Sequence, residues 1–386
     1  MSTRKKTTRK KARPAAAEPA EPKAPSAALA AIRTQIDGID GEIQALIAAR
    51  ARIAQAVGTT KRAAGTATAE FYRPEREAEV LKAVIARNSG PLSNEEMVRL
   101  FREIMSACLA QQEPLKVAFL GPEGTFTQQA VLKHFGHSVR ALPLPAIDEV
   151  FREVESGVAD FGVVPIENST EGTVSHTADM FLLSPLKICG EVELRVHQHL
   201  MGHVRALERI ERICSHQQSL AQCRGWLAEN LPQVELIPVA SNAEAARRAR
   251  DEKGTAAIAG AAAAEVYGLP ILVPEIEDRA DNATRFLVVG RKLLEPSGTD
   301  RTTLLLSAPD TAGPGALVKL LEPLARYRIS MTRLESRPSR RKKWDYVFFI
   351  DIEGHARDAT VAKALAAIKK RASLFKLLGS YPRAVL

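Results

Sequence analysis

Apolar residues recur at alternating spacings of three and four positions between residues 29 and 57, which is the pattern of an amphipathic helix. Two more stretches with this rhythm cover residues 76–86 and 95–112. We therefore predict an all-helical domain at residues 27–113 whose apolar stripes are buried. The stripe of the first helix is formed by Leu29, Ile32, Ile36, Ile39, Ile43, Leu46, Ile53 and Val57.

Three cations stand within the first stripe: Arg33 near its start, Arg50 in its middle and Lys61 at its end. A guanidinium in an apolar seam is costly unless an anion meets it there. Any one of these side chains could instead reach water from a partly buried stem or form a structural ion pair. Three of them on one helix favour a binding site for a small polyanion.

The spacing along the helix separates the first cation from the other two. At ~1.5 Å per residue, Arg33 and Arg50 stand roughly 25 Å apart, whereas Arg50 and Lys61 stand roughly 16 Å apart. Long side chains can span the second distance around one metabolite, but not the first. Arg33 would then serve a site held mainly by another subunit, so we expect an interlocked homodimer or a higher homo-oligomer. The other two helices also carry polar residues on or at the ends of their apolar faces, namely Arg76, Glu77 and Gln112.

After Pro114 the pattern changes to short apolar runs that alternate with helical segments, which is typical of an α/β region. We assign it to residues 115–291, a length that suits one domain or two lobes around a cleft. The predicted strands are Lys116–Leu120, Phe161–Ile166, Ala256–Ala259 and Phe286–Val289. The predicted helices are Thr127–Phe135, Ala146–Ser156, Leu220–Asn230 and Ala243–Asp251.

Four polar segments follow or join these strands, where α/β sheets place their ligands. They are Gly121–Thr127, Val163–Gly172, Ser215–Cys223 and Asn282–Phe286. Glycines in the first segment let backbone N–H groups approach an anion at a helix N-terminus. The segment is neither a Walker loop nor a dinucleotide fingerprint. Each segment taken alone could be an ordinary turn or helix cap.

Residues 301–381 predict a third domain with the element order strand, helix, two strands, helix, strand, as in a ferredoxin-like α/β sandwich. A glycine-containing turn, Pro314–Val318, begins its first helix, and Leu334–Pro338 ends its second strand. A capped helix and a charged strand end would explain both segments without a ligand. The predicted elements are Thr302–Ala308, Gly315–Tyr327, Ile329–Pro338, Trp344–Glu353, Ala359–Arg371 and Phe375–Tyr381.

The formal net charge of +9 is concentrated in one segment. Residues 1–26 contain eight Lys and Arg residues against Glu18 and Glu21, so they contribute +6. This tail is rich in Ala, Pro and Lys, so we expect disorder and non-specific contact with nucleic acid at most. A transit peptide is a less favoured alternative, and no folded nucleic-acid module is indicated.

No apolar run is long enough to cross a membrane, and the N-terminus lacks the apolar core of a signal peptide. The four cysteines show no CxxC pairing, which favours reduced thiols and a cytoplasmic protein.

His197, His199 and His203 form an H-x-H-x3-H pattern. Without nearby Cys or carboxylate ligands this is usually a surface or core pair, so we expect no metal and no cofactor.

The helical domain resembles the all-helical chorismate mutases, which carry this arrangement of cations, Arg-Glu and a terminal Gln. The resemblance implies that the partner's copy of Arg33, with Arg50 and Lys61, binds the carboxylates and ether oxygen of chorismate. It also implies that Glu77 holds a substrate hydroxyl with Arg76 nearby, and that Gln112 donates to the ether oxygen. Arg73 and Cys108 depart from some relatives, in which an acidic and a hydroxyl residue stand at these positions.

The four polar segments match, in order and wording, those of prephenate dehydratase, a family that folds as two α/β lobes like a periplasmic binding protein. The resemblance implies that Thr284 and Glu167 lie near the reacting ring. Gln217 and Thr127 depart from the usual residues of the family motifs. The residues implied to bind the substrate prephenate are Asn168, Ser169, Ser215, Gln218 and Arg285.

The C-terminal domain resembles the ACT regulatory domain, which implies that L-phenylalanine binds where two such domains meet. The chain as a whole thus resembles an enzyme that converts chorismate through prephenate to phenylpyruvate under feedback control. A dehydratase with purely dimerising helices and a non-catalytic amino-acid sensor are the alternatives. Arg50, Lys61 and Gln112 argue against the first, and Thr284 and Gln218 against the second. The implied effector residues are Gly315, Ala316, Leu317, Glu335 and Ser336.

Overall fold

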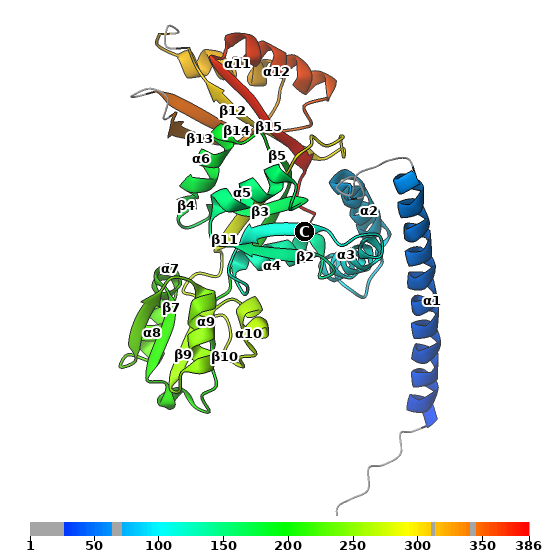
Figure 1. Cartoon of the computed structure of the whole chain (residues 1–386), viewed down its shortest axis with the longest axis vertical. Helices are drawn as coiled ribbons and strands as arrows, with labels where there is room; N and C mark the ends of the chain where they lie inside the picture. Colours follow the sequence, from blue (N-terminus) through cyan, green and yellow to red (C-terminus); the bar gives the residue numbers. More distant parts are fainter. Residues whose placement is uncertain (1–26, 64–71, 310–312, 340–344, 386) are drawn as a thin grey trace, which may run out of the picture. The chain divides into compact units, whose positions relative to one another are not determined.

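The computed structural model describes residues 27–63, 72–309, 313–339 and 345–385 (Figure 1). It divides into two compact units, one ending at Arg50 and the other beginning at Ala51, and we describe each by itself. The basic tail predicted at residues 1–26 lies outside the described residues. None of the helices in the described ranges is both long and apolar enough to span a bilayer.

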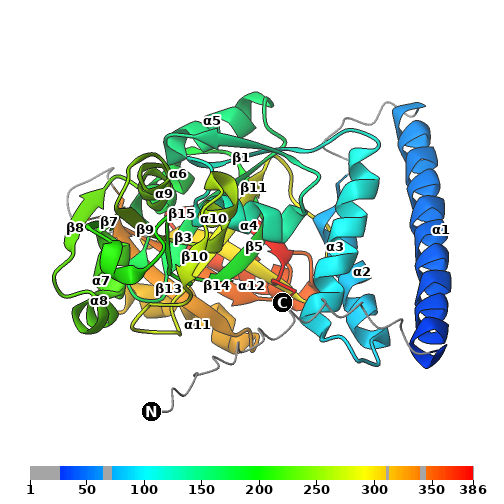
Figure 2. The same cartoon turned by 90° about the horizontal axis from the view of Figure 1, so that it is seen from below.

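The three helices predicted at the start of the chain are confirmed as α1 (Ala27–Ala63), α2 (Pro74–Arg87) and α3 (Asn94–Ala110). Pro74 opens α2, where the missing N–H costs nothing. A capping box between Ser93 and Glu96 opens α3. Helices α2 and α3 lie side by side (Figure 2).

The apolar stripe of α1 is not buried within its own unit. Its side chains from Leu29 to Leu46 are between 42% and 70% exposed, although we predicted a buried face. A contiguous stripe of exposed Leu and Ile on one helix is typical of an interaction surface. The pattern therefore located the stripe correctly, but the stripe is exposed on its helix.

The first α/β lobe is a mixed sheet with strand order β2-β1-β3-β11-β5, to which β4 adds through β3. The first three of these strands run parallel, while β11 lies antiparallel between β3 and β5. The strands are β1 (Lys116–Leu120), β2 (Arg140–Leu144), β3 (Phe161–Asn168), β4 (Gly172–Thr173), β5 (Lys187–Arg195) and β11 (Ala283–Gly290). The helices are α4 (Phe126–Phe135), α5 (Ile147–Ser156) and α6 (Ser175–Leu183).

The second lobe is a five-stranded sheet of order β10-β6-β9-β7-β8. The single helix predicted at Leu220–Asn230 is wrong, because Cys223 leaves the helical backbone region and divides it into two. The strands are β6 (His199–Met201), β7 (Arg212–His216), β8 (Glu235–Val239), β9 (Thr255–Ala259) and β10 (Ile271–Val273). The helices are α7 (Gln217–Gln222), α8 (Arg224–Asn230), α9 (Asn242–Asp251) and α10 (Ala261–Tyr267).

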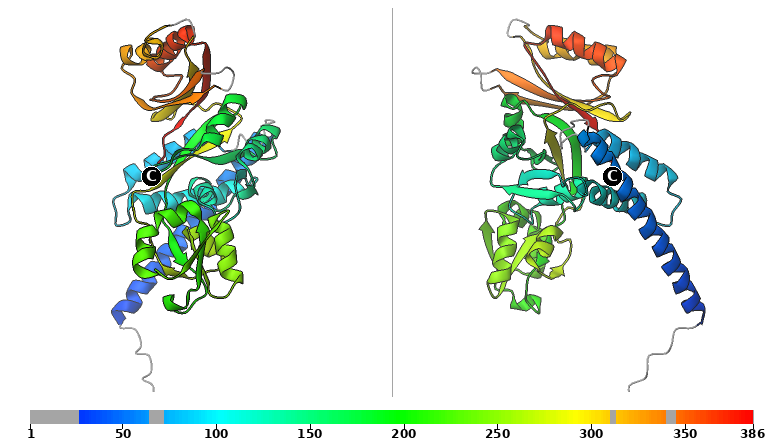
Figure 3. Two further views of the ribbon diagram at one scale, coloured as in Figure 1. Left: turned by 90° about the vertical axis from the view of Figure 1, so that its left-hand side faces the viewer. Right: turned by 45° about the vertical axis from the view of Figure 1, so that its right-hand side comes forward.

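The C-terminal domain has the predicted ferredoxin-like order, with two helices on one face of an antiparallel sheet (Figure 3). The sheet order is β13-β14-β12-β15. Trp344, the predicted start of the third strand, lies outside the described residues. The elements are β12 (Asp300–Ser307), α11 (Ala316–Arg326), β13 (Met331–Pro338), β14 (Tyr346–Glu353), α12 (Ala359–Arg371) and β15 (Leu374–Pro382).

The C-terminal sheet and the first lobe share one hydrophobic core. Phe349 and Tyr381 of the C-terminal sheet are buried in the same cluster as Ile188 and Leu287 of the first lobe. Gly379 permits the close approach, because a Cβ atom there would collide with the backbone of Ile188. The two sheets are thus held together by dispersion contacts and burial of apolar surface, as within a single domain.

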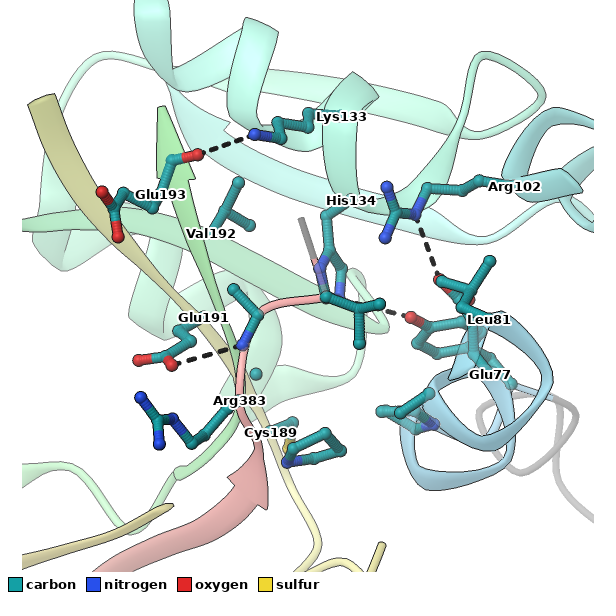
Figure 4. Close-up of a pocket in the computed structure, with 17 residues that line it drawn as sticks. Glu77, Leu81, Arg102, Lys133, His134, Cys189, Glu191, Val192, Glu193 and Arg383 are labelled. Atoms are coloured by element: carbon teal, nitrogen blue, oxygen red, sulfur yellow. Dashed lines mark hydrogen bonds and ion pairs between the residues drawn. The ribbon is translucent and has the colours of Figure 1, made fainter. Parts of the chain in front are cut away.

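The helical segment meets the first lobe at a cluster of polar side chains (Figure 4). Nε of Arg102 on α3 donates to Glu77 at 3.4 Å, and the Tyr72 hydroxyl lies 3.3 Å from Nε2 of His134 on α4. Burial raises the pKa of Glu77 despite the neighbouring Arg102. Burial, reinforced by the positive charge of Arg102, lowers the pKa of His134 to about 3, so this imidazole is neutral in the native state.

This burial predicts an acid-sensitive junction. An unfolded histidine titrates near pH ~6.5, so below that pH the unfolded chain binds a proton that the folded chain does not. Stability therefore falls as the pH is lowered from 6.5 towards 3, by about 1.6 kcal/mol between pH 6.5 and 5, because the unfolded imidazole is already half protonated at pH 6.5. His134→Gln, which keeps an acceptor for Tyr72, should reduce this loss. Denaturant unfolding of both proteins at pH 7 and 5 checks this, and equal losses would contradict it.

Candidate active site

A cleft of about 790 Å³ opens between the two α/β lobes. Its walls bring together parts of the four polar segments that the sequence singled out. The first lobe contributes Thr125, Asn168 and Thr284, and the second contributes Gln218. Segments more than a hundred residues apart in the sequence therefore meet at one site.

Strand pairing places Thr284 directly beside Asn168. The two residues are opposite each other in the antiparallel ladder of β11 with β3. Nδ2 of Asn168 donates to Oγ1 of Thr284 at 2.9 Å and to Oδ1 of Asn282 at 3.0 Å. Oδ1 of Asn168 accepts from the backbone N–H groups of Thr170 and Glu171, which fixes the amide. Because the threonine oxygen accepts from Asn168, its own hydrogen is available for a ligand.

In the second lobe, a buried serine holds a residue that lines the cleft. Ser215 is fully buried, and its hydroxyl contacts Oδ1 of Asn242 at 3.1 Å and donates to the carbonyl of Ile258 at 2.6 Å. Asn242 lines the cleft and also accepts from Ser219 and from the N–H of His216. The structure thus places Ser215 behind Asn242, one layer away from the cleft.

The sequence reasoning missed several amides that face the cleft. Gln198 is 1% exposed, and its Nε2 donates to Oγ of Ser219 and to Oε1 of Gln222, both at 3.1 Å. Its Oε1 is buried and has no partner in the described structure, so it can accept from a ligand. Gln198 lies inside the histidine pattern, which drew attention to His197 and His199 instead. Asn242 was missed because it lies outside the four polar segments and directly before the predicted helix Ala243–Asp251.

The histidine pattern has ordinary partners. Nδ1 of His197 pairs with Glu277 at 2.8 Å, and Nδ1 of His199 accepts the backbone N–H of Glu275 at 3.1 Å. Burial lowers the pKa of His199, which favours its neutral, accepting form. These contacts orient the chain between the two lobes.

Backbone dipoles supply positive potential to the cleft. Among the described residues that line it, none is Lys, Arg, Asp or Glu. The N-terminal ends of α4 and α9 border it, capped by the side chains of Thr125 and Ser241. Helix N-termini favour anions through free N–H groups and the macrodipole. The cleft can therefore bind a small anion and donate a hydrogen bond from Thr284.

Three other predicted dehydratase residues lie away from this cleft. Glu167 pairs with Arg333 of β13 at 3.1 Å. Ser169 accepts from the N–H of Ala283 at 3.0 Å and so secures the start of β11. The Arg285 guanidinium points to the C-terminal domain and is not among the groups that line the cleft.

The predicted mutase residues lie in several different surroundings. Gln112 donates from Nε2 to the carbonyl of Ala54 at 2.8 Å. Cys108 is buried in the last turn of α3, four residues before Gln112. Lys61 lines a pocket of about 470 Å³, and Arg76 is exposed and paired with Glu79. Glu77 faces the junction cluster described above. Arg33 and Arg50 belong to the other unit, where α1 carries both.

The predicted effector residues lie around the start of α11 and along β13. Gly315 is the N-cap of α11 and has a φ of 77°, which glycine adopts without strain. Ala316 and Leu317 follow it and are partly buried. Glu335 contacts Thr173 and Arg333, whereas Ser336 on the opposite side of the strand is exposed.

Three protein families match the sequence. Chorismate mutase type II matches residues 32–113, prephenate dehydratase matches residues 117–293, and the ACT domain matches residues 302–370. The three matches follow one another along the chain without overlap. They coincide with the helical segment, the two α/β lobes and the ferredoxin-like domain.

Individual relatives agree with these matches. A bifunctional chorismate mutase/prephenate dehydratase from Stutzerimonas stutzeri is 55% identical over 358 residues, which are 92% of this chain and 98% of the relative. The prephenate dehydratase of Arthrobacter aurescens in complex with L-Phe has 35% sequence identity and a TM-score of 0.65, with 70% of this chain and 90% of that chain covered. A structure described as a quorum quenching acylase, GqqA, has 31% identity and a TM-score of 0.64, with 70% and 98% covered.

The same fold thus carries differently described activities, so the fold alone does not identify the reaction. The match to the Stutzerimonas relative covers the helical segment, both lobes and the C-terminal domain together. The chain belongs to the family of bifunctional chorismate mutase/prephenate dehydratases.

Proposed function

We propose that the chain converts chorismate to prephenate in its helical domain and prephenate to phenylpyruvate in the cleft between its lobes. The observation that carries the second activity is the hydrogen bond from Asn168 to Thr284 at the wall of the cleft. In this hydrogen bond the Thr284 oxygen is the acceptor, so the hydroxyl hydrogen of Thr284 can be donated to a ligand. The helix N-termini at the cleft favour an anionic ligand. The product phenylpyruvate serves phenylalanine synthesis.

The dehydration needs a donor at the leaving oxygen. The bond from the ring to its carboxylate breaks, and its electron pair enters the ring as carbon dioxide departs. The ring C–O bond breaks at the same time, and its oxygen leaves as water after gaining one proton. Hydroxide is a poor leaving group, so the donor must act as that bond breaks. Thr284 serves as donor or proton relay, with Gln218 on the facing wall, and Asn168 holds the threonine in place.

The rearrangement of chorismate needs no nucleophile and no general base. It needs the substrate held in a reactive conformer and donors where charge develops on the breaking C–O bond. Arg50 and Lys61 bind the carboxylates and the ether oxygen. Gln112 donates its second N–H to the ether oxygen, since the first is used by Ala54. Glu77 holds the substrate hydroxyl, and Arg76 and Cys108 border the site.

The exposed stripe of α1 supports a homodimer. Six Leu and Ile side chains from Leu29 to Leu46 face solvent on this helix, and a second copy of the same helix would bury them. Arg33 stands on this part of α1 and would reach the mutase site of the partner subunit. Burial of the stripe and completion of the site are then the same event.

Mixing two inactive variants tests both the mutase site and its division between chains. Arg50→Ala and Arg33→Ala should each abolish chorismate turnover while prephenate turnover remains. Mixed dimers contain one site with both arginines intact, so refolding the two variants together should restore part of the activity. Chorismate consumption checks this. Near-parental turnover by Arg50→Ala alone, or no recovery in the mixture despite dimer exchange, would contradict the assignment.

Thr284→Val tests the cleft, because it keeps the size of the side chain but removes the hydroxyl. We expect kcat for prephenate to fall by about 10²–10³-fold, the usual loss of a donor to developing charge. Chorismate turnover by the same preparation should stay at the parental rate, which controls for folding. Phenylpyruvate formation at the parental rate would show that Thr284 is not the donor.

L-Phenylalanine is the proposed effector of the C-terminal domain, as the related dehydratase in complex with L-Phe suggests. The start of α11 offers backbone approach at Gly315, and β13 offers the exposed Ser336 beside Leu334. A zwitterion with an aromatic ring fits such a mixed polar and apolar surface, with Glu335 and Leu317 at its border. Inhibition follows if the effector binds one state of the enzyme better than another.

Ser336→Ala tests this site with little risk to the fold, because the side chain is exposed. A substitution at Gly315 would strain the backbone and confuse the result. We expect L-phenylalanine to inhibit prephenate turnover more than chorismate turnover, and Ser336→Ala to shift that inhibition to higher concentrations. Thr332→Ala, on the same exposed side of β13, is the matched control. Superimposable inhibition curves for parent and Ser336→Ala would place the effector elsewhere.

We place the protein in the cytoplasm. All four cysteines are buried free thiols, and burial raises the pKa of both Cys189 and Cys223 to about 12. Such thiols are unreactive and form no disulfides, as in proteins of a reducing compartment.

A further inference from the structure

We propose that Arg285 is a positioning residue, which ties the strand that carries Thr284 to the C-terminal domain and so holds the threonine hydroxyl in the cleft. The inference rests on the proposed dehydratase function. It differs from the role in substrate binding that the sequence resemblance implies for this residue.

The Arg285 guanidinium is fully engaged on the side away from the cleft. Nε donates to Oε2 of Glu191 at 3.0 Å, Nη1 to Oδ2 of Asp351 at 2.8 Å, and Nη2 to the Tyr381 hydroxyl at 3.1 Å. The side chains are 16% exposed for Arg285 and 2% for Asp351, and Tyr381 is fully buried. An arginine with three such partners has one fixed orientation.

The partners of Arg285 are themselves held by the C-terminal sheet. Thr303 of β12 donates to Oδ1 of Asp351 at 2.6 Å and contacts the Tyr381 hydroxyl at 2.8 Å. Arg301, also on β12, bonds to Glu191. Three neighbouring strands of the C-terminal sheet, β14, β12 and β15, thus fix the groups that Arg285 meets. A satisfied buried polar network of this kind is rigid and specific.

Strand geometry couples the position of Arg285 to that of Thr284. Thr284 and Arg285 are consecutive on β11, so their side chains point to opposite faces of the sheet. One lines the cleft, and the other reaches the C-terminal domain. A shift or rotation of β11 that releases one side chain must therefore move the other.

The neighbouring strand carries a matching anchor. Glu167 is opposite Arg285 in the β3–β11 ladder, and its carboxylate pairs with Arg333 of β13 at 3.1 Å. Asn168, which holds Thr284, follows it directly. Both strands that form the Asn168–Thr284 contact are thus tied to the C-terminal domain by charged side chains.

The charge of Arg285 is stable in this environment. Burial alone would lower the pKa of Arg285, but Tyr381, Asp351 and Glu191 together raise it above its ordinary value. To bind prephenate directly, the guanidinium would have to leave two carboxylates and a phenol. That would leave Asp351 as a buried charge without its cation, which is strongly unfavourable.

Asp351→Asn in the full chain tests the inference from a position outside the cleft. Asparagine keeps the size and an acceptor for Thr303 but removes the charge that holds Arg285. We expect kcat for prephenate to fall by about five- to twentyfold with KM changed by less than about twofold, as for lost positioning. Chorismate turnover should be unchanged. Tyr381→Phe removes only the phenol oxygen that accepts from Arg285 and should show a smaller loss of kcat. This second variant keeps the inference testable if Asp351→Asn does not fold.

Arg371→Gln is the matched control, because Arg371 is also an arginine of the C-terminal domain, but its ion pair with Glu322 joins α12 to α11 and involves none of the partners of Arg285. It should keep the parental kcat. Parental kcat in both Asp351→Asn and Tyr381→Phe would overturn the inference. So would Arg285→Lys with a raised KM at unchanged kcat, since that result indicates substrate contact. A parent chain without prephenate turnover would overturn the proposed function, whereas an active parent with unaffected variants would overturn this inference alone.

Discussion

The antiparallel pairing of β11 with β3 is the constraint on which the dehydratase half of the molecule depends. It sets Thr284 opposite Asn168, and the resulting hydrogen bond leaves a hydroxyl donor at the cleft. It also sets Arg285 opposite Glu167 on the side that meets the C-terminal domain. One strand register therefore fixes both the groups at the cleft on one face and the contacts with the C-terminal domain on the other.

The course of the chain explains why the cleft lies where it does. The polypeptide leaves the first lobe after β5, builds the whole second lobe, and returns through β11 into the middle of the first sheet. The connections between the lobes border the cleft, and ligands commonly bind where two lobes or domains meet. The helix N-termini at its edges place backbone N–H groups at the cleft, where they favour an anion.

The sequence predicted the elements with a strong hydrophobic period and the polar segments of the site, for physical reasons. Periodicity of three to four identified α1, α2 and α3, and the element order identified the ferredoxin-like domain. The strands Arg140–Leu144 and Glu235–Val239 were not predicted, because each contains a proline, which is rare inside strands. The longer strand β5 (Lys187–Arg195) was not predicted either. The motif segments led to Asn168, Gln218 and Thr284. They could not distinguish residues that face the cleft from those that turn away. Arg285 follows Thr284 on β11 and so points to the opposite face of the sheet, and Ser215 is buried behind Asn242. The exposure of the α1 stripe could not be judged either, because periodicity shows which face of a helix is apolar but not what covers that face.

The central claim is that one chain performs two consecutive reactions at separate sites. The most direct test supplies purified full-length protein with chorismate alone and follows chorismate, prephenate and phenylpyruvate over time. We expect prephenate to rise first and then to decline as phenylpyruvate accumulates to match the chorismate consumed. Prephenate that accumulates without phenylpyruvate, or chorismate that is not consumed while added prephenate is, would contradict it.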